Sequence, residues 1–245
     1  MANLIIDIGN SRAKAVVMDG DALVKEYVAE AFNASLFEEI MEAYPTIERA
    51  IIASTRGDEL SAKEVAETRL SRVVIFKPAT TPIPLENHYY TPETLGADRL
   101  AAAIGAQALH PNADIMIVDF GTAITIDFVE GGAFKGGNIS PGVTTRFRAL
   151  ADYTACLPRC YATEEVLDYG RTTKEAIEQG VMRGIEQEIR GYIEPFMQKN
   201  GEKCIIFTGG DAKYFVKRIK NTIFADCEPV VFGLNRILNY NAERI

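Results

Sequence analysis

The chain has 245 residues and a formal net charge of −8 at pH 7, with 47% hydrophobic and 24% charged residues. These values are ordinary for a globular protein, and the acidic balance argues against a general role on nucleic acid or on an anionic membrane. Met1-Ala2-Asn3 leads directly into a predicted strand, and no apolar run reaches the ~20 residues that span a bilayer, so we expect a cytoplasmic protein with a small-molecule partner.

The first third of the chain predicts an antiparallel meander followed by alternating helices and strands. Strands are expected over residues 3–8, 13–18 and 22–29, with a hairpin turn at Asp19-Gly20-Asp21. The pattern then predicts, in order, a helix over 35–43, a strand over 50–53, a helix over 59–70 and a strand over 73–76. Residues 77–92 hold four of the ten prolines and predict a loop that leads into Gly96-Ala97-Asp98-Arg99.

The rest of the chain repeats this order. An alanine-rich helix over 98–109 precedes predicted strands over 114–119, 123–128 and 134–138, with a turn at Gly131-Gly132. Pro141 is well placed to begin a helix whose N-terminus could face an anion. The remaining predicted elements are a helix over 174–197 that is interrupted or ended near Pro195, a strand over 204–207, and helices over 212–220 and 230–240.

A strand and its turn are duplicated in the sequence. Ile5-Ile6-Asp7-Ile8-Gly9 returns as Ile117-Val118-Asp119-Phe120-Gly121, 112 positions later (119 − 7), and Gly20 and Gly132 have the same spacing (132 − 20) without a gap. The order predicts an α/β protein of two duplicated ribonuclease-H-like lobes, residues 1–110 and 111–245. Each lobe is expected to be a mixed β-sheet flanked by helices, with the ligand between the lobes.

Each repeated turn offers groups that suit a phosphate chain and its metal. A strand ends in an acid, a glycine lets the backbone approach, and a hydroxyl follows at Ser11 and Thr122. Mg²⁺ is usually held by one or two carboxylates plus substrate phosphates, so Asp7 could contact the metal through water. Each turn taken alone could also be an ordinary strand-ending turn. The pair Gly209-Gly210 is equally open between an adenosine contact and a turn.

Other chemistries find little support in the sequence. There is no G-x-x-x-x-G-K-[ST], no G-x-G-x-x-G after a strand and no protein-kinase motif set. The four cysteines form no C-x-x-C, and only two histidines are available to complete a zinc site. Cys156 and Cys160 could be redox-active or could share one helical face, and we favour the structural interpretation.

These segments together resemble the type III pantothenate kinases, which belong to the superfamily of acetate and sugar kinases, heat-shock chaperones and actin. The resemblance spans nearly the whole chain. The two Asp-x-Gly turns, Gly136-Gly137 and Pro141-Gly142 are similar to its phosphate motifs. Its most distinctive element resembles Tyr89-x-x-Pro92-x-x-x-Gly96-Ala97-Asp98-Arg99.

The resemblance implies an actin-like ATPase fold with ATP in the interlobe cleft. It also implies ATP-dependent phosphorylation of the terminal hydroxyl of pantothenate to 4′-phosphopantothenate, the first step of coenzyme A biosynthesis. Asp98 matches the catalytic acid that accepts the substrate proton. The implied substrate-binding residues are Tyr89, Gly96, Ala97, Asp98, Arg99 and Thr173. The implied ATP-binding residues are Asp7, Ile8, Gly9, Asn10, Ser11, Arg12, Ala13, Lys14 and Thr122.

The resemblance further implies Mg²⁺ with ATP, a monovalent cation (K⁺ or NH₄⁺) bound by Asp119, and a homodimer with substrate sites near the subunit interface. Many family members have Asn-Thr where this chain has Asn10-Ser11, followed here by the bulkier, charged Arg12. Serine keeps the hydroxyl, so we expect the phosphate contact to survive.

Simpler interpretations exist for three of these residues. Asp98 could be an acid that favours a helix N-terminus, with Arg99 an exposed neighbour. Tyr89 could be a packed loop aromatic, and Thr173 could be the N-cap of the long helix. At the level of function, the alternatives are a kinase of the same superfamily that acts on another small hydroxy acid, and a nucleotide-binding regulatory protein.

Overall fold

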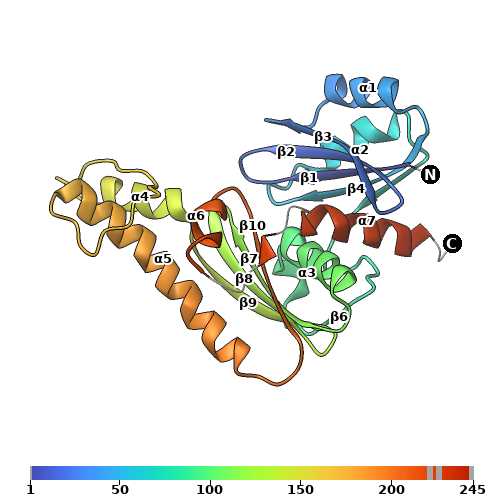
Figure 1. The fold of residues 1–245 in the computed structure, drawn as a ribbon. Coiled ribbons are helices and arrows are strands. Elements are labelled where there is room, and N and C mark those ends of the chain that lie inside the picture. The colour runs from blue at the N-terminus through green and yellow to red at the C-terminus, as the bar shows by residue number, and fades with distance from the viewer. Residues whose placement is uncertain (1, 220–222, 225–227, 243–245) are drawn as a thin grey trace. The chain divides into compact units, whose positions relative to one another are not determined.

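The computed structural model describes residues 2–219, 223–224 and 228–242 (Figure 1). The chain divides into two compact units. The first comprises Met1–Pro111, Gly132–Phe134 and Cys227–Ile245, and the second comprises Asn112–Gly131 and Lys135–Asp226. The C-terminal helix therefore packs in the first unit, whereas the sequence placed all of residues 111–245 in the second lobe.

The first unit is built on a mixed sheet of five strands in the order β3-β2-β1-β4-β5. The strands β1, β2 and β3 form the predicted antiparallel meander, and β4 and β5 run parallel to β1. Their bounds are β1 Ala2–Ile8, β2 Ala13–Asp19, β3 Ala22–Ala29, β4 Ile47–Ser54 and β5 Arg72–Ile75.

The second sheet repeats this topology. Its order is β11-β10-β7-β8-β9-β6, in which β7 is antiparallel to β8 and parallel to β10, and β10 is parallel to β11. From β9 to β11 the five strands therefore follow the order of the first sheet from β3 to β5, and the predicted duplicated ribonuclease-H-like architecture is confirmed. The bounds are β7 Asp114–Phe120, β8 Ala123–Glu130, β9 Ala133–Pro141, β10 Lys203–Thr208 and β11 Ile223–Phe224.

The loop over 77–92 contains a strand that the sequence did not predict. This strand, β6 (Glu86–Asn87), pairs in parallel with Ala133 and Phe134, which belong to the first unit. Its pairing continues one step further, because the His88 N–H donates to the Phe134 carbonyl at 2.9 Å. The loop ends in a short 3₁₀ helix, η1 (Pro92–Thr94).

The sequence repeat was expected to run without a gap, but the structure contains one. The strands β1 and β7 are offset by 112 residues (114 − 2). The residue pair that flanks the turn is Ile8 with Ala13 in the first hairpin and Phe120 with Ile124 in the second, so four residues separate the first pair and three separate the second. The first turn is therefore one residue longer.

This extra residue changes which later glycines correspond. Gly20 and Gly131 each follow the last residue of the second strand and have nearly equal φ values of 56° and 59°. The structural equivalent of Gly20 is therefore Gly131, and the predicted match to Gly132 is wrong by one position.

Helices cover both faces of the first sheet (Figure 1). One face packs α1 (Ala34–Ala43) and α2 (Glu59–Glu67) over alternate buried residues of β1, namely Leu4, Ile6 and Ile8. On the other face, α7 (Pro229–Ala242) contacts β1, β4 and α3 (Ala97–Leu109). The predicted ends of these helices lie within three residues of the observed ones.

The helices α3 and α7 cross in backbone contact at two glycines. A Cβ atom at Gly105 would lie 2.0 Å from the Pro229 carbonyl oxygen, and one at Gly233 would lie 1.8 Å from the Ala101 carbonyl oxygen. Side chains larger than hydrogen would therefore force the helices apart. This crossing fixes the position of α3, whose first turn carries Asp98.

Buried asparagines join α7 to the sheet. Asn3 Nδ2 donates to Asn235 Oδ1 at 2.7 Å and to Asn239 Oδ1 at 3.0 Å, and Asn235 Nδ2 donates to the Gly20 carbonyl at 2.9 Å. Asn3 and Asn235 are each only 1% exposed. Because a buried amide without partners is costly, these hydrogen bonds hold α7 in one register on β1.

In the second unit, α5 (Thr173–Met197) packs Val181, Met182 and Ile185 into a core formed with Val118 and Phe120 of β7. The helix runs through Pro195 and ends at Met197, the predicted last residue, two positions after the proline near which an interruption or end was expected. Its last two residues complete the final turn.

Further differences from the sequence prediction concern short elements of the second unit. Pro141 is the last residue of β9, and α4 (Val143–Asp152) begins two residues later with Gly142 as its N-cap. The predicted helix over 212–220 is the shorter α6 (Lys213–Val216), and Lys220 lies outside the described residues. Cys156 and Cys160 lie between α4 and α5 and share no helical face; Cys156 is exposed and Cys160 is buried.

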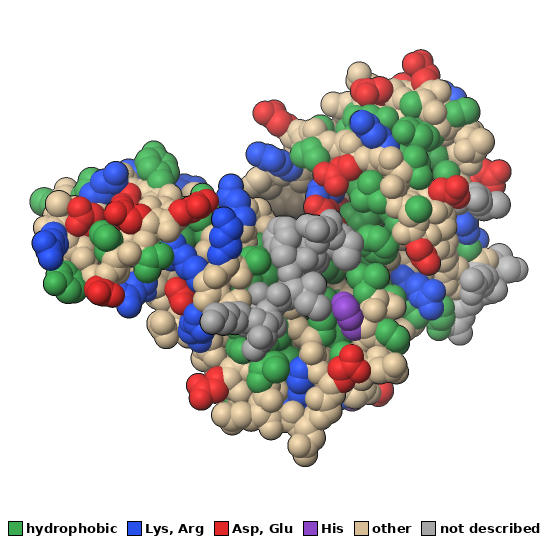
Figure 2. All heavy atoms as spheres, in the orientation of Figure 1, with side chains coloured by type: hydrophobic (Ala, Val, Ile, Leu, Met, Phe, Trp, Pro, Cys, Tyr) green, Lys and Arg blue, Asp and Glu red, His purple; other side chains and the backbone are tan. Residues whose placement is uncertain are grey.

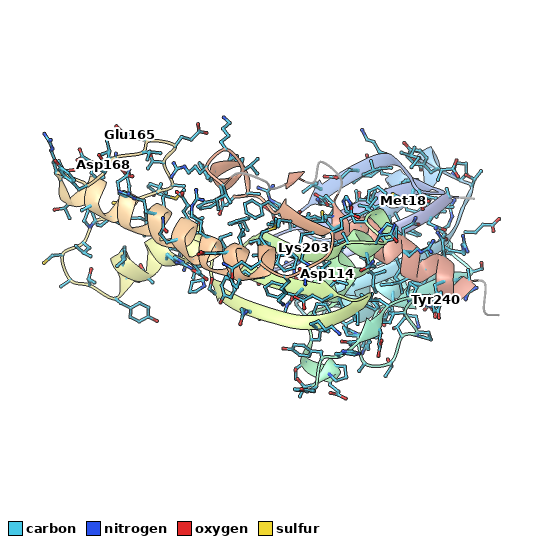
Figure 3. The ribbon with its side chains drawn as sticks, turned by 60° about the horizontal axis from the view of Figure 1, so that its bottom comes forward. Met18, Asp114, Glu165, Asp168, Lys203 and Tyr240 are labelled. Atoms are coloured by element: carbon cyan, nitrogen blue, oxygen red, sulfur yellow. The ribbon has the colours of Figure 1, made fainter. Side chains whose placement is uncertain are left out.

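An ion pair joins the starts of β7 and β10 (Figure 3). Lys203 Nζ lies 2.6 Å from Asp114 Oδ2, and the Lys203 side chain is 4% exposed. Asp114 Oδ1 also accepts from the Gly131 N–H at 2.8 Å. The hydrogen bond from Lys203 is the main cause that holds the pKa of Asp114 below 3.8.

We expect Asp114→Asn to lower the free energy of unfolding by about 2 kcal/mol at pH 7, because it leaves the Lys203 ammonium buried without its charge partner. Since the pKa of Asp114 is depressed in the folded state, its contribution is present above pH 3.8 and is lost as the pH falls further. Urea unfolding at pH 7 and pH 3 should show a difference from the parent protein that shrinks at the lower pH. Glu130→Gln, which removes the more exposed Lys199 pair, should change stability by less than about 1 kcal/mol.

Candidate functional site

Two predicted carboxylates lie close enough in the first unit to interact electrostatically. Asp7 stands near the carboxyl end of β1, and Asp98 stands in the first turn of α3. Burial, followed by the charge of Asp98, raises the pKa of Asp7 to about 7. The side chain of Asp98 accepts a hydrogen bond from the Arg99 N–H at 2.8 Å. A strand end and a helix N-terminus thus bring together two acids that are 91 positions apart (98 − 7).

Lys14 lies beside this pair. It is the direct cross-strand partner of Asp7, and its charge lowers the pKa of Asp7 without cancelling the effect of burial. The Lys14 ammonium forms ion pairs with Glu26, at 3.7 Å, and with Glu228, the residue that precedes α7. Glu228 belongs to no motif that the sequence alone reveals.

The first turn presents its polar groups to solvent. The Gly9 N–H donates to the Arg12 carbonyl at 2.9 Å, which closes the turn and leaves Asn10 and Ser11 exposed between them. The remaining predicted ATP-binding residues of this segment differ in accessibility: the side chains of Ile8 and Ala13 are buried in the core. Those two residues can offer a ligand only their backbone.

A second strand end adds hydroxyl groups to this region. Thr55, just after β4, donates from its N–H to the Ile8 carbonyl at 2.9 Å. Ser54 Oγ donates to Asp58 Oδ1 at 2.7 Å and accepts from the Arg56 N–H at 3.0 Å. These residues were not among the predicted site residues, because their loop lacks a glycine motif.

The predicted substrate loop packs on the start of α3. The Arg99 guanidinium lies over the Tyr89 ring at 5.7 Å from its centre, and the ring also contacts Phe134 at 6.2 Å between ring centres. Arg99 is 6% exposed, so the interpretation as an exposed neighbour of Asp98 is wrong. Tyr89 is partly buried, as expected for a packed aromatic. Its contact with Arg99 nevertheless ties the loop to the residue after Asp98.

A cavity of about 470 Å³ opens beside this loop. Its walls come from the ends of β4 and β5, from η1 and from the start of α3, and they include Ser54, Thr55, Lys77, Gly96 and Ala97. Glu59 also lines it, 3.8 Å from Lys77 Nζ. The cavity combines apolar walls with hydroxyl groups, two acidic residues (Glu59 and Glu93) and the basic Lys77, which suits a small polar ligand.

Gly96 leaves room for the Asp98 carboxylate. A Cβ atom at position 96 would lie 2.5 Å from Asp98 Oδ1, while the backbone there has an ordinary φ of −58°. We therefore expect Gly96→Ala to displace the carboxylate and lower kcat by about 10- to 100-fold, because small misplacements of catalytic groups have effects of this size.

The measurement for Gly96→Ala is steady-state turnover together with the melting temperature. Gly191→Ala is the matched control, because no atom lies within 4 Å of a Cβ atom at that helical position. The control should keep full turnover. Full turnover in Gly96→Ala as well would show that the position of the Asp98 carboxylate is unimportant.

The second turn is closed in the same way as the first. The Gly121 N–H donates to the Ala123 carbonyl at 3.1 Å, which leaves Thr122 exposed at the position that corresponds to Ser11. The Thr122 carbonyl accepts from the Gly142 N–H at 3.0 Å and from Thr145 Oγ1 at 2.7 Å. The start of α4 is thereby tied to the turn.

The pair Gly209-Gly210 adjoins the second turn. Gly209 has φ +91°, and a Cβ atom there would lie 2.3 Å from Asp119 Oδ1. The Asp211 N–H donates to the Phe120 carbonyl at 3.1 Å. Glycine at position 209 therefore lets the end of β10 approach the Asp119 carboxylate, which the sequence alone did not indicate.

Thr173 is not the N-cap of α5. The N-cap is Thr172, whose side chain accepts from the Glu175 N–H at 3.2 Å, while Glu175 Oε2 accepts from the Arg171 N–H at 2.7 Å. Thr173 is the exposed first residue of the helix. Its hydroxyl is therefore not used for the cap.

The oxygen donors suit hard cations whose remaining coordination positions are filled by a bound ligand. Within the described residues there is no group of three or more His, Cys, Asp or Glu side chains that could hold a metal. One carboxylate at Asp7 is nevertheless the kind of ligand that Mg²⁺ uses together with phosphate oxygens, and Asp119 offers another oxygen donor at the second turn. None of the helices among the described residues has the length and apolar character of a transmembrane span.

Several known proteins are similar to this chain in sequence or in fold. The family model of type III pantothenate kinases matches residues 3–195. A type III pantothenate kinase of Phocaeicola vulgatus is 44% identical over 98% of both chains. Among solved structures, a Baf family protein of Campylobacter jejuni has a TM-score of 0.64 at 22% identity, covering 98% of this chain and 99% of that one.

A second structural neighbour is the activator of 2-hydroxyisocaproyl-CoA dehydratase from Clostridium difficile, which was solved with bound ADPNP. It has a TM-score of 0.57 at 13% identity and covers 100% of this chain and 98% of that one. These two structures support the actin-like ATPase fold alone. The family model and the sequence identity to the Phocaeicola vulgatus protein reach further, and the chain belongs to the type III pantothenate kinase family.

Proposed function

We propose that the protein transfers the terminal phosphoryl group of ATP to the terminal hydroxyl of pantothenate, giving 4′-phosphopantothenate in the first step of coenzyme A biosynthesis. Membership in the family supports this reaction. The observation that carries it is the Asp98 carboxylate in the first turn of α3, electrostatically coupled to Asp7 and directly after the cavity residues Gly96 and Ala97.

In this proposal Asp98 orients the pantothenate hydroxyl and accepts its proton. Phosphoryl transfer depends mainly on alignment and charge neutralisation, because its transition state is loose. The Arg99 N–H, which donates to Asp98, fixes the direction of the carboxylate. We assign the 470 Å³ cavity to the acceptor, with Tyr89, Gly96, Ala97, Arg99 and Thr173 as further substrate-binding residues.

We assign ATP binding to the two turns. The exposed polar groups of the first turn and the Lys14 ammonium support this assignment. The residues are Asp7, Ile8, Gly9, Asn10, Ser11, Arg12, Ala13 and Lys14 of the first unit and Thr122 of the second. Ile8 and Ala13 would act through their backbone.

Two cations complete the proposal. Asp7 would hold Mg²⁺, through water, and Asp119 would hold K⁺ or NH₄⁺. When bound, these ions offset the negative charge of the phosphates. Because the reaction consumes ATP, we place it in the cytoplasm.

We also propose a homodimer. Exposed aromatic side chains gather in the segment between α4 and α5, where Tyr153, Tyr161 and Tyr169 are 89%, 70% and 67% exposed. Over this part of the second unit, hydrophobic side chains lie among charged ones (Figure 2). Large exposed apolar side chains of this kind are typical of interfaces. Sedimentation analysis of the full chain should give twice the monomer mass, and a monomer would refute this part of the proposal.

The decisive experiment is an ADP-release assay with pantothenate, Mg²⁺ and either K⁺ or Na⁺. We expect ADP release that requires pantothenate and is faster with K⁺ than with Na⁺. Release with another small hydroxy acid but not with pantothenate would change the assigned substrate. ATP binding without transfer to any acceptor would favour a nucleotide-binding regulatory protein.

A further inference from the structure

The position of Lys14 raises a problem for a carboxylate that must bind a metal. Lys14 stands directly opposite Asp7 in the antiparallel register of β1 and β2. Side chains at such positions leave the same face of the sheet with Cβ atoms about 5 Å apart. A lysine there is long enough to neutralise Asp7, and a carboxylate that is paired with an ammonium is a weaker metal ligand.

The ion pairs that Lys14 forms are with two glutamates. Its ammonium pairs with Glu228 in a contact that is also a hydrogen bond, and more distantly with Glu26 at 3.7 Å. Lys14 is 21% exposed and Glu228 is 37% exposed, so the closer pair is partly shielded from water. The longer Glu26 contact is expected to contribute little.

Glu228 is held by a rigid element. Its carbonyl accepts from the Phe232 N–H at 3.2 Å, so it stands at the N-terminus of α7. That helix is fixed by its backbone contact with α3 at Gly233 and by the buried hydrogen bond between Asn3 and Asn235. A side chain on such a support can keep a partner in one orientation.

We propose that Glu228 is a positioning residue that holds the Lys14 ammonium away from Asp7. The Asp7 carboxylate then stays available to the metal-nucleotide complex, and Lys14 keeps two of its three N–H groups for phosphate oxygens. The inference rests on the proposed role of Asp7 in nucleotide binding. Without Glu228, the remaining charges near Lys14 include Asp7 itself, and the ammonium should move to it.

The test measures nucleotide binding without pantothenate, so its outcome is independent of the identity of the acceptor. ATP binding is followed by calorimetry while Mg²⁺ is varied, for the parent protein, Glu228→Gln, Lys14→Met and the double variant. We expect Glu228→Gln to raise the Mg²⁺ concentration for half-maximal ATP binding about tenfold, and to have no further effect once Lys14 is methionine. Glu26→Gln is the matched control and should change this concentration less than twofold.

A crystal structure of Glu228→Gln gives a second readout, because Lys14 Nζ should then lie within hydrogen-bond distance of the Asp7 carboxylate. Glu228→Asp keeps the charge on a shorter side chain, and it should give an intermediate shift with an unchanged melting temperature. It decides the question if Glu228→Gln does not fold. Parent-like Mg²⁺ dependence in the folded variants, or a shift that persists in the Lys14→Met background, would overturn the proposal.

Discussion

Replacing Asp98 by asparagine is expected to lower kcat about a thousandfold, because asparagine keeps the shape of the side chain but cannot accept the proton of the substrate hydroxyl. The asparagine oxygen can still accept from the Arg99 N–H, as the carboxylate does now at 2.8 Å. The position of the side chain should therefore be retained, and the loss should be chemical. Steady-state turnover with pantothenate measures it.

ATP binding separates this effect from a general disturbance of the site. The charge of Asp98 is the second cause of the raised pKa of Asp7, so its removal should lower the pKa of Asp7 and leave ATP binding intact or slightly tighter. Glu42→Gln, at an exposed position in α1 that does not line the cavity, is the control and should keep parent turnover. A turnover of Asp98→Asn within tenfold of the parent would exclude Asp98 as the proton acceptor.

The sequence predicted the architecture because local patterns determine most of it. Short continuous apolar runs mark the first two meander strands, and Asp-x-Gly marks both strand ends where Asp7 and Asp119 stand. Turn length is less predictable from spacing. The pairing of Ile8 with Ala13, against Phe120 with Ile124, shows that one inserted residue shifts the repeat without changing either strand.

From the sequence, candidate site residues could be named only where they belong to a motif. Glu228 is 214 positions from Lys14, and their contact depends on α7 packing against the first sheet, which no local pattern encodes. An acid directly before Pro229 is a recognisable helix start, yet it does not indicate what the side chain contacts. Ser54 and Thr55 enter the region only because β4 lies next to β1.

Replacing Asp7 by asparagine is expected to lower turnover about a thousandfold or more. The same replacement is expected to stabilise the nucleotide-free protein at pH 8. Burial is the main cause of the raised pKa of Asp7, about 7 against an ordinary 3.8. An acid with a raised folded-state pKa holds its proton while the unfolded chain releases it, so stability falls as the pH rises from about 4 to about 7. Asparagine carries no charge and avoids this loss.

The size of the gain follows from the shift and from solvation. Three pKa units correspond to about 4 kcal/mol as an upper limit. Because part of the Asp7 side chain reaches the surface, we expect a gain of about 1–2 kcal/mol at pH 8 and none at pH 4. Urea unfolding of the parent and Asp7→Asn at both values measures it, with the exposed Asp21→Asn as a control that should show no pH-dependent gain.

Mg²⁺ and ATP should reverse the order of the two proteins. Ligand binding stabilises only the form that binds, so the melting temperature of the parent should rise with Mg²⁺ and ATP while that of Asp7→Asn stays nearly constant. The buried carboxylate would then lower the stability of the free protein, and it would be retained because it binds the metal. An Asp7→Asn variant that is less stable than the parent at pH 8, or that responds equally to Mg²⁺ and ATP, would contradict this account of Asp7.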